Sequence, residues 1–211
     1  DMAKTAGEFD GAAVGLVLGD ISWDRIEILD MYRKEIVRVG IPFYPVVGNH
    51  DHELEASGDI NTTARYRQIM GPENYAFFMG KDVVIVVDNI IYDTQKKYVE
   101  GYADHVLAWV KSLERLLPYG ADLYIAQHSP LMKWDEGNAR IVNSADMLDI
   151  VRGRKVTFIS GHTHIKMDEI RQSIRCLNPG SVSIPKDGSH SCLTYENGSF
   201  SVVILEDGNG M

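Results

Sequence analysis

The sequence places Gly48-Asn49-His50-Asp51 directly after the apolar run 43–47 (FYPVV), and Gly161-His162-Thr163-His164 directly after the run 156–160 (VTFIS). Two other apolar runs end in the same way: 12–18 (AAVGLVL) before Gly19-Asp20, and 123–126 (LYIA) before Gln127-His128. Short apolar runs bounded by glycine and polar residues are typical of buried strands. We therefore predict four buried strands, each ending in a polar cluster.

Segments with helical periodicity lie between these strands. Apolar residues recur at helical spacing within 25–39, 62–70, 104–117 and 145–151. Gly40 is placed to cap the first of these helices. A further strand is predicted at 83–87, and the region 172–206 is predicted to be β-rich, with turns at 178–180 and 197–198.

Strands that alternate with helices predict an α/β fold. In open α/β sheets, ligands bind at the carboxyl ends of the strands. The polar clusters that end the predicted strands should therefore meet at one edge, although they are far apart in the sequence.

The composition excludes several classes of protein. The 211 residues include 21 Lys and Arg against 30 Asp and Glu, a net charge of −9, and 45% of them are hydrophobic. This is an ordinary globular composition, and the length suits one large domain. The net negative charge argues against an extended nucleic-acid-binding surface, because neutralising phosphates requires clustered Lys and Arg. No apolar run approaches the ~18 residues that a membrane span needs.

Two further properties stay open at this stage. Cys176 and Cys192 are interpreted either as core residues or as one disulfide. No pattern in the sequence indicates an oligomeric state.

The strand-end clusters combine the side chains that bind transition metals. Together they offer one carboxylate, one amide oxygen and three imidazoles, on Asp20, Asn49, His128, His162 and His164. This mixed set suits Mn, Fe, Zn or Ni better than calcium, which prefers oxygen ligands alone. Each residue alone has an ordinary structural explanation, but the joint pattern favours a metal centre. His105 and His190 are interpreted as structural histidines outside it.

The ordered motifs Gly-Asp, Gly-Asn-His-Asp, a lone His and Gly-His-Thr-His resemble those of the calcineurin-like metallophosphoesterase superfamily. The resemblance extends from about Ala12 to about Ser183 and includes the segment 178–183 (NPGSVS). It implies a four-layer α/β sandwich, in which helices flank two mixed β-sheets. It also implies a binuclear centre of two divalent metal ions at the edge of the sandwich.

The resemblance also implies a role for each motif residue. Asp20 would bridge the two ions, Asn49, His128 and His162 would complete one of them, and His164 would bind the other. A metal-bridging hydroxide would attack the phosphorus of a small phosphorylated substrate, either a phosphomonoester or a phosphodiester. His50 would protonate the leaving oxygen, and Asp51 would orient His50.

Two positions differ from particular branches of the superfamily. Asp51 stands where protein phosphatases carry Glu, and Trp23 stands where purple acid phosphatases carry a metal-binding Tyr. Both branches are therefore disfavoured. Asp24 is interpreted as a partner of the site or as an N-cap, and His52 has no clear family role.

Candidate pocket residues are aromatic or basic and lie between the motifs. They are Trp23, Tyr98, Tyr102, Lys133, Trp134 and Arg140, with Trp134 the preferred one.

One family motif is absent. No Asp-x-His precedes Asp20, so two ligands of the second ion and the first family strand are missing from this sequence. We therefore expect residues 1–211 to be a single, N-terminally incomplete domain that holds two ions, one or none, and we expect it to be cytoplasmic. The alternative is a truncated or non-catalytic member that acts as a metal/phosphate-binding or scaffold module. An unrelated amidohydrolase is disfavoured, because it usually carries an early His-x-His.

Overall fold

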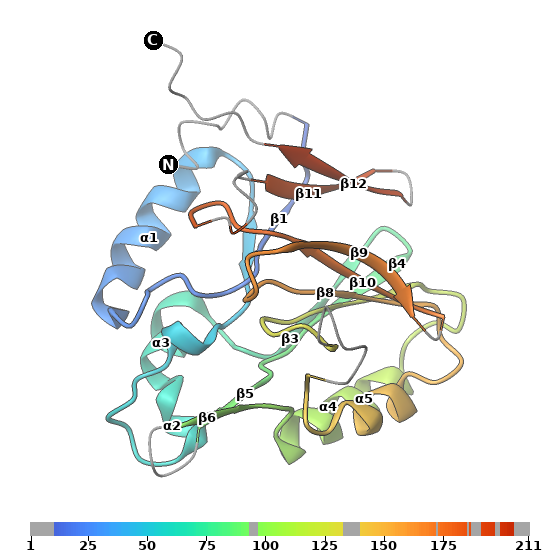
Figure 1. The fold of residues 1–211 in the computed structure, drawn as a ribbon, viewed down its shortest axis with the longest axis horizontal. Helices are drawn as coiled ribbons and strands as arrows, with labels where there is room; N and C mark the ends of the chain where they lie inside the picture. Colours follow the sequence, from blue (N-terminus) through green and yellow to red (C-terminus); the bar gives the residue numbers. More distant parts are fainter. Residues whose placement is uncertain are drawn as a thin grey trace.

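A six-stranded mixed sheet forms the centre of the computed structural model, which describes residues 11–92, 97–132, 140–171, 173–184, 186, 191–196 and 199–204 (Figure 1). The strand order is β3-β4-β7-β8-β10-β9. The four inner strands are parallel to one another, and the edge strands β3 and β9 are antiparallel to their neighbours. The bounds are Tyr75–Met79 (β3), Asp82–Val86 (β4), Leu123–Ala126 (β7), Val156–Ile159 (β8), Lys166–Arg171 (β9) and Ile174–Pro179 (β10).

Three of the inner strands, β4, β7 and β8, are buried on both faces, which explains their mostly apolar sequences. Every residue of β4, β7 and β8 is buried. One face of the sheet packs against two helices, α4 (Asp104–Glu114) and α5 (Ser144–Ile150), which lie together below the sheet in Figure 1. Val106 and Val110 of α4 and Met147 of α5 complete this core.

The opposite face of the sheet packs against a second β layer. Its strands β1 (Gly15–Val17) and β2 (Phe43–Pro45) are parallel, with Leu16 opposite Tyr44. A second core joins this layer to the sheet through Leu16 and Val46, which pack in one cluster with Val84. The hairpin β11 (Ser191–Glu196) and β12 (Ser199–Ile204) adds Leu193 and Tyr195 to the same core.

Helices cover the outer side of the second layer. A third core packs Leu29 of α1 (Leu29–Ile36) and Tyr66 of α3 (Ala64–Met70) against Val47, which follows β2. The layers therefore run helix, β layer, mixed sheet, helix, and the predicted mixed α/β class is confirmed. The remaining elements are η2 (Ile26–Ile28), η3 (Val37–Val39), η4 (Asn49–Asp51), α2 (Asp59–Thr62), β5 (Ile90–Tyr92) and β6 (Tyr98–Glu100).

The predicted helix at 25–39 forms as three joined pieces, η2, α1 and η3. It ends at Gly40 as predicted, because Gly40 has a φ of 88°, a left-handed conformation that glycine adopts without strain. The strands β3, β5, β6 and β9 were not predicted. β5 and β6 are too short to show a period, and β3 and β9 are edge strands that lack a buried apolar run. Among the described helices, none is both long and apolar enough to cross a membrane.

Candidate metal centre

Four strand ends meet where the two β layers adjoin. Asp20 follows β1, Asn49 follows β2, His128 follows β7 and His162 follows β8, as the polar clusters predicted. Glycines allow the loops to approach one another. A Cβ on Gly19 would collide with the ring of His128, and a Cβ on Gly48 would collide with Asp20. The motif glycines are therefore required by close packing between loops.

The donor atoms of the four residues converge on one point. Ligand atoms of Asp20, His128 and His162 all lie within 4.8 Å of one another. Nε2 of His128 lies 3.0 Å from Oδ1 of Asn49, 3.0 Å from Nδ1 of His162 and 3.2 Å from Oδ1 of Asp20. Asn49 and His128 are buried, so water does not solvate these atoms freely.

The hydrogen bond on the far side of His128 decides which nitrogen carries its proton. Nδ1 of His128 lies 2.6 Å from the carbonyl oxygen of Leu18. A carbonyl only accepts, so Nδ1 carries a hydrogen. Burial disfavours the charged ring, but the contact with Asp20 outweighs burial and raises the pKa of His128. A metal ligand must be unprotonated, and without a proton on Nε2 the facing lone pairs of this buried site repel unless a cation lies between them. Two oxygens and two nitrogens fit a borderline divalent cation such as Mn, Fe, Zn or Ni.

The contacts of Asp20 favour its ionised form. Burial alone would raise the pKa of this carboxyl. Its contact with His128 and the hydrogen bond from the backbone N–H of His50 outweigh burial and lower the pKa to about 2. Asp20 is thus a carboxylate at neutral pH, as a metal ligand must be.

A partly buried pair, Glu100 and Arg140, holds His162 in the orientation needed for binding. Nε2 of His162 lies 3.2 Å from Oε1 of Glu100, and Nη2 of Arg140 donates a hydrogen bond of 2.7 Å to the same oxygen. A carboxylate on one ring nitrogen leaves the other nitrogen to bind a metal. Burial lowers the pKa of His162 despite the contact with Glu100, so the neutral ring is favoured. Sequence reasoning missed Glu100, which lies in β6 outside any motif.

The structure does not bring His164 into the same cluster. The described group of mutually close His, Cys, Asp and Glu ligand atoms contains Asp20, His128 and His162 only. His162 and His164 both have left-handed φ values, of 64° and 59°. Buried Asn178 braces this turn by donating to the carbonyl oxygen of Gly161 at 2.5 Å and to Thr163 Oγ1 at 3.1 Å. The 178–183 segment therefore supports the Gly-His-Thr-His turn.

The partner of His50 is not the expected one. Nδ1 of His50 lies 2.9 Å from Oδ2 of Asp24. Asp51 instead accepts hydrogen bonds from the backbone N–H of Ser22 at 2.6 Å and of Gly48 at 3.0 Å, and it is fully buried. The expectation that Asp51 orients His50 therefore does not match these contacts. Asp51 thus links the two loops that contain Asp20 and His50.

The loop between Asp20 and Asp24 is strained. Asp20, Trp23 and Asp24 all have left-handed φ values, of 57°, 52° and 63°. The indole of Trp23 stacks on the ring of His50 with ring centroids 4.7 Å apart and an interplanar angle of 28°. Asp24 is not an N-cap, because no side chain caps the start of η2.

The other predicted residues take separate places. His52 is buried, and its Nδ1 lies 2.6 Å from Thr62 Oγ1. His105 is exposed on α4. Tyr102 is buried and donates to Gln127, so it does not line a pocket. Lys133, Trp134 and His190 lie outside the described residues, so the predictions for them stay predictions.

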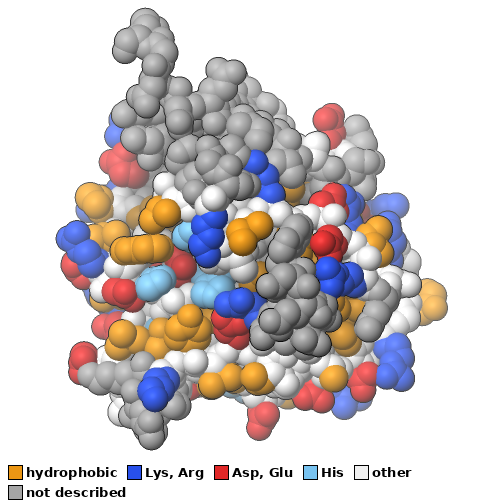
Figure 2. Space-filling view, in the orientation of Figure 1, with side chains coloured by type: hydrophobic (Ala, Val, Ile, Leu, Met, Phe, Trp, Pro, Cys, Tyr) orange, Lys and Arg blue, Asp and Glu red, His pale blue; other side chains and the backbone are white. Residues whose placement is uncertain are grey.

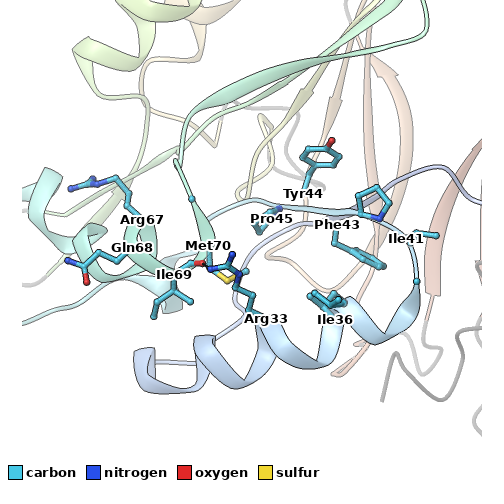
Figure 3. Close-up of a pocket in the computed structure, with 14 residues that line it drawn as sticks. Arg33, Ile36, Ile41, Phe43, Tyr44, Pro45, Arg67, Gln68, Ile69 and Met70 are labelled. Atoms are coloured by element: carbon cyan, nitrogen blue, oxygen red, sulfur yellow. Dashed lines mark hydrogen bonds between the residues drawn. The ribbon is translucent and has the colours of Figure 1, made fainter.

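The exposed face of the site is visible in Figure 2. Histidine side chains lie side by side there, with acidic and basic side chains next to them and hydrophobic side chains on two sides. A separate groove of about 770 Å³ lies between α1, α3 and β2 (Figure 3). Its basic side chains are already engaged, because Arg33 donates to the carbonyl oxygen of Ile69 and Arg67 pairs with Glu73. None of the metal-ligand candidates lines this groove.

A family model described as a calcineurin-like phosphoesterase superfamily domain matches residues 2–198. The chain belongs to this superfamily. A search of curated proteins finds no match.

Two solved structures show a related fold at 14% sequence identity. A candidate 5′-nucleotidase from Staphylococcus aureus, solved in complex with alpha-ketoglutarate, has a TM-score of 0.53 and a match covering 100% of this chain and 49% of that one. This chain thus spans about half the length of that protein. A phosphopantetheinyl hydrolase from Mycobacterium tuberculosis has a TM-score of 0.50, with 79% of this chain and 78% of that chain covered.

Proposed function

We propose that this chain hydrolyses a small phosphomonoester or phosphodiester with the help of a divalent metal ion. Membership in the calcineurin-like phosphoesterase superfamily supports phosphoester hydrolysis at a general level. The observation that carries the proposal is the convergence of Asp20, Asn49 and His162 on Nε2 of His128. These donor atoms are close enough together to bind one cation.

We propose that Asp20, Asn49, His128 and His162 hold one ion, and that His164 contributes to a second ion that shares Asp20. Bound divalent ions supply positive charge for the phosphoryl oxygens and activate water for attack on phosphorus. Glu100 and the carbonyl of Leu18 orient the two ring ligands from behind. The −9 charge of the chain would otherwise disfavour an anionic substrate, so the site depends on the ions.

His50 is the proposed general acid. Its ring is partly exposed, with 31% of the side chain accessible, and so can meet a substrate. Because Nδ1 faces the carboxylate of Asp24, Nε2 is left to deliver a proton to the leaving oxygen. Its backbone N–H donates to Asp20 at 3.1 Å, which ties the acid to the ligand cluster. Asp51 is proposed to keep this loop geometry.

The test combines metal depletion with two substrates. The protein is stripped with a chelator and reconstituted with Mn²⁺, and hydrolysis of bis(p-nitrophenyl) phosphate and of p-nitrophenyl phosphate is followed before and after. We expect turnover of at least one ester only in the reconstituted sample. Bound Mn²⁺ without turnover of either ester would contradict hydrolysis and favour a non-catalytic metal/phosphate-binding module.

A further inference from the structure

The side chain of Trp23 lies partly exposed beside His50 and not in a hydrophobic core. Its φ of 52° is unfavourable for a bulky residue, and the residue is 47% exposed. Both features cost free energy relative to a relaxed loop with a buried indole. The surrounding contacts enforce this position, because the N–H of Ser22 donates to Asp51 and the N–H of Asp24 donates to the carbonyl oxygen of His50 at 2.9 Å. The indole is therefore held rigidly beside the site.

The two faces of this indole differ. One face stacks on the imidazole of His50, with the ring centroids 4.7 Å apart. Trp23 as a whole is 47% exposed, so the stack on His50 leaves part of the indole in contact with solvent. An open, rigid aromatic face next to a reactive centre is a platform on which a planar ring can stack.

The distance to His50 limits how such a ring connects to the reacting phosphate. A ring stacked on the outer face would lie roughly 9 Å or more from the imidazole, because one more stacking distance is added. That is too far for a ring bonded directly to a leaving oxygen within hydrogen-bond reach of His50. Several atoms must join ring and oxygen, as ribose joins a base to its 5′-phosphate.

The charges around the platform favour a neutral ring. The carboxylate of Asp24 is adjacent to Trp23 in sequence and 50% exposed. A second anionic group on this side would be repelled, whereas an uncharged base would not. Tyr98, 39% exposed and edge-on to His162 with ring centroids 6.5 Å apart, adds a second aromatic side chain at the site. Hydrophobic side chains lie on two sides of the histidines in Figure 2.

We propose that Trp23 forms a subsite for the base of a nucleoside phosphate, with the base stacked on the indole face opposite His50. This proposal deepens and rests on the proposed phosphoester hydrolysis, because the phosphate must reach the metal ligands. Stacking tolerates different bases, since every base has a π-face. The subsite therefore selects for a base and not for its identity.

The test compares two ligands that differ only by the base. They are the phosphonate analogues of adenosine 5′-monophosphate and of ribose 5-phosphate, in which a P–C bond replaces the ester bond and blocks hydrolysis. Their dissociation constants are measured by calorimetry on the Mn²⁺-loaded protein. We expect the adenosine analogue to bind about tenfold more tightly. Trp23→Ala should abolish this ratio, Trp23→Phe should keep most of it, and Tyr119→Ala, which removes an 86% exposed ring elsewhere, should leave it unchanged.

The outcomes separate the two proposals. Two results would overturn the subsite. One is equal affinity of the unaltered protein for the two analogues, and the other is an equal loss of affinity for both analogues in Trp23→Ala. Neither result would contradict the proposed hydrolysis of nitrophenyl esters. A base preference that depends on Trp23, in a protein that hydrolyses none of the esters, would support the subsite and contradict the proposed hydrolysis.

Discussion

The side chains of Asp24 and His50 meet although 26 residues separate them, with Oδ2 of Asp24 2.9 Å from Nδ1 of His50. The strained loop that follows β1 makes this contact, and the same loop places Asp20 among the metal-ligand candidates. One short segment thus supplies a ligand, the aromatic platform and the partner of the proposed acid. The predictions below separate these roles.

Asp24→Asn should lower kcat by about ten- to hundredfold, because the carboxylate that orients the imidazole is lost. KM and bound Mn²⁺ should stay unchanged, since Asp24 is not among the converging donors. Steady-state kinetics and elemental analysis of the variant measure both. Asp30→Asn is the matched control, because Asp30 is a similarly exposed carboxylate paired with Arg65. An unchanged kcat in Asp24→Asn would refute this positioning role.

His50→Ala should lower turnover by about 10²–10⁴ and leave the bound metal in place. The backbone N–H that donates to Asp20 remains in the variant, so the ligand cluster keeps this support. Metal content and kcat are measured side by side, with His105→Ala, an exposed histidine on α4, as the control. Loss of metal from His50→Ala would show that His50 is a ligand and not the acid.

Glu100→Gln should weaken Mn²⁺ binding by about 10–100-fold, because the charged group that orients His162 is removed. The metal dissociation constant, measured by calorimetry, reports this effect independently of activity. Glu114→Gln is the control, since Glu114 makes a comparable pair with Arg154 at 2.9 Å far from the cluster. Equal affinities in the two variants would exclude the orienting role of Glu100.

Asp88 should make the fold less stable as the pH rises. Burial raises the pKa of Asp88 well above its ordinary value. Thr62 donates to the carbonyl oxygen of Asp59, so it accepts from Nδ1 of His52 and leaves the lone pair of His52 Nε2 facing Asp88 at 4.0 Å. The pKa of Asp88 is raised in the folded protein, so folding favours its protonated form. The contribution of Asp88 to the free energy of unfolding is complete below the unfolded pKa of about 3.9 and is lost as the pH rises through the folded pKa.

Asp88→Asn should therefore raise the melting temperature at pH 7, by about 2–4 °C for each kcal/mol gained, and have little effect near pH 4. The amide still accepts from the N–H of Ile90, as the carboxylate does at 2.9 Å, and can donate toward His52. Thermal unfolding across this pH range measures the difference, with Asp146→Asn, exposed on α5, as the control. A variant that is less stable than the unaltered chain at pH 7 would contradict the assignment.

The strand ends could be predicted from the sequence because they rest on local signals. The apolar runs that became β7 and β8 are buried on both faces, and the residues that follow them, His128 and His162, lie where the runs end. Motif and periodicity therefore located the ligand candidates Asp20 and Asn49 as well.

The supporting contacts could not be predicted because they join distant segments. Glu100 reaches His162 from a short, mostly exposed strand that has no periodic pattern. Asp24, and not Asp51, contacts His50, in a loop where residues 23 and 24 have left-handed conformations. The sequence Trp23-Asp24 does not predict these conformations. Side-chain direction in a strained loop is set by tertiary contacts and not by local propensity.

The most direct measurement is the anomalous difference map of a crystal of this protein grown or soaked with Mn²⁺. We expect a peak about 2.0–2.3 Å from Oδ1 of Asp20, Oδ1 of Asn49, Nε2 of His128 and Nδ1 of His162. A second peak, next to Asp20 and His164, would support the binuclear form. Electron density for these four side chains without a peak between them, or a peak only elsewhere, would contradict the proposed metal centre.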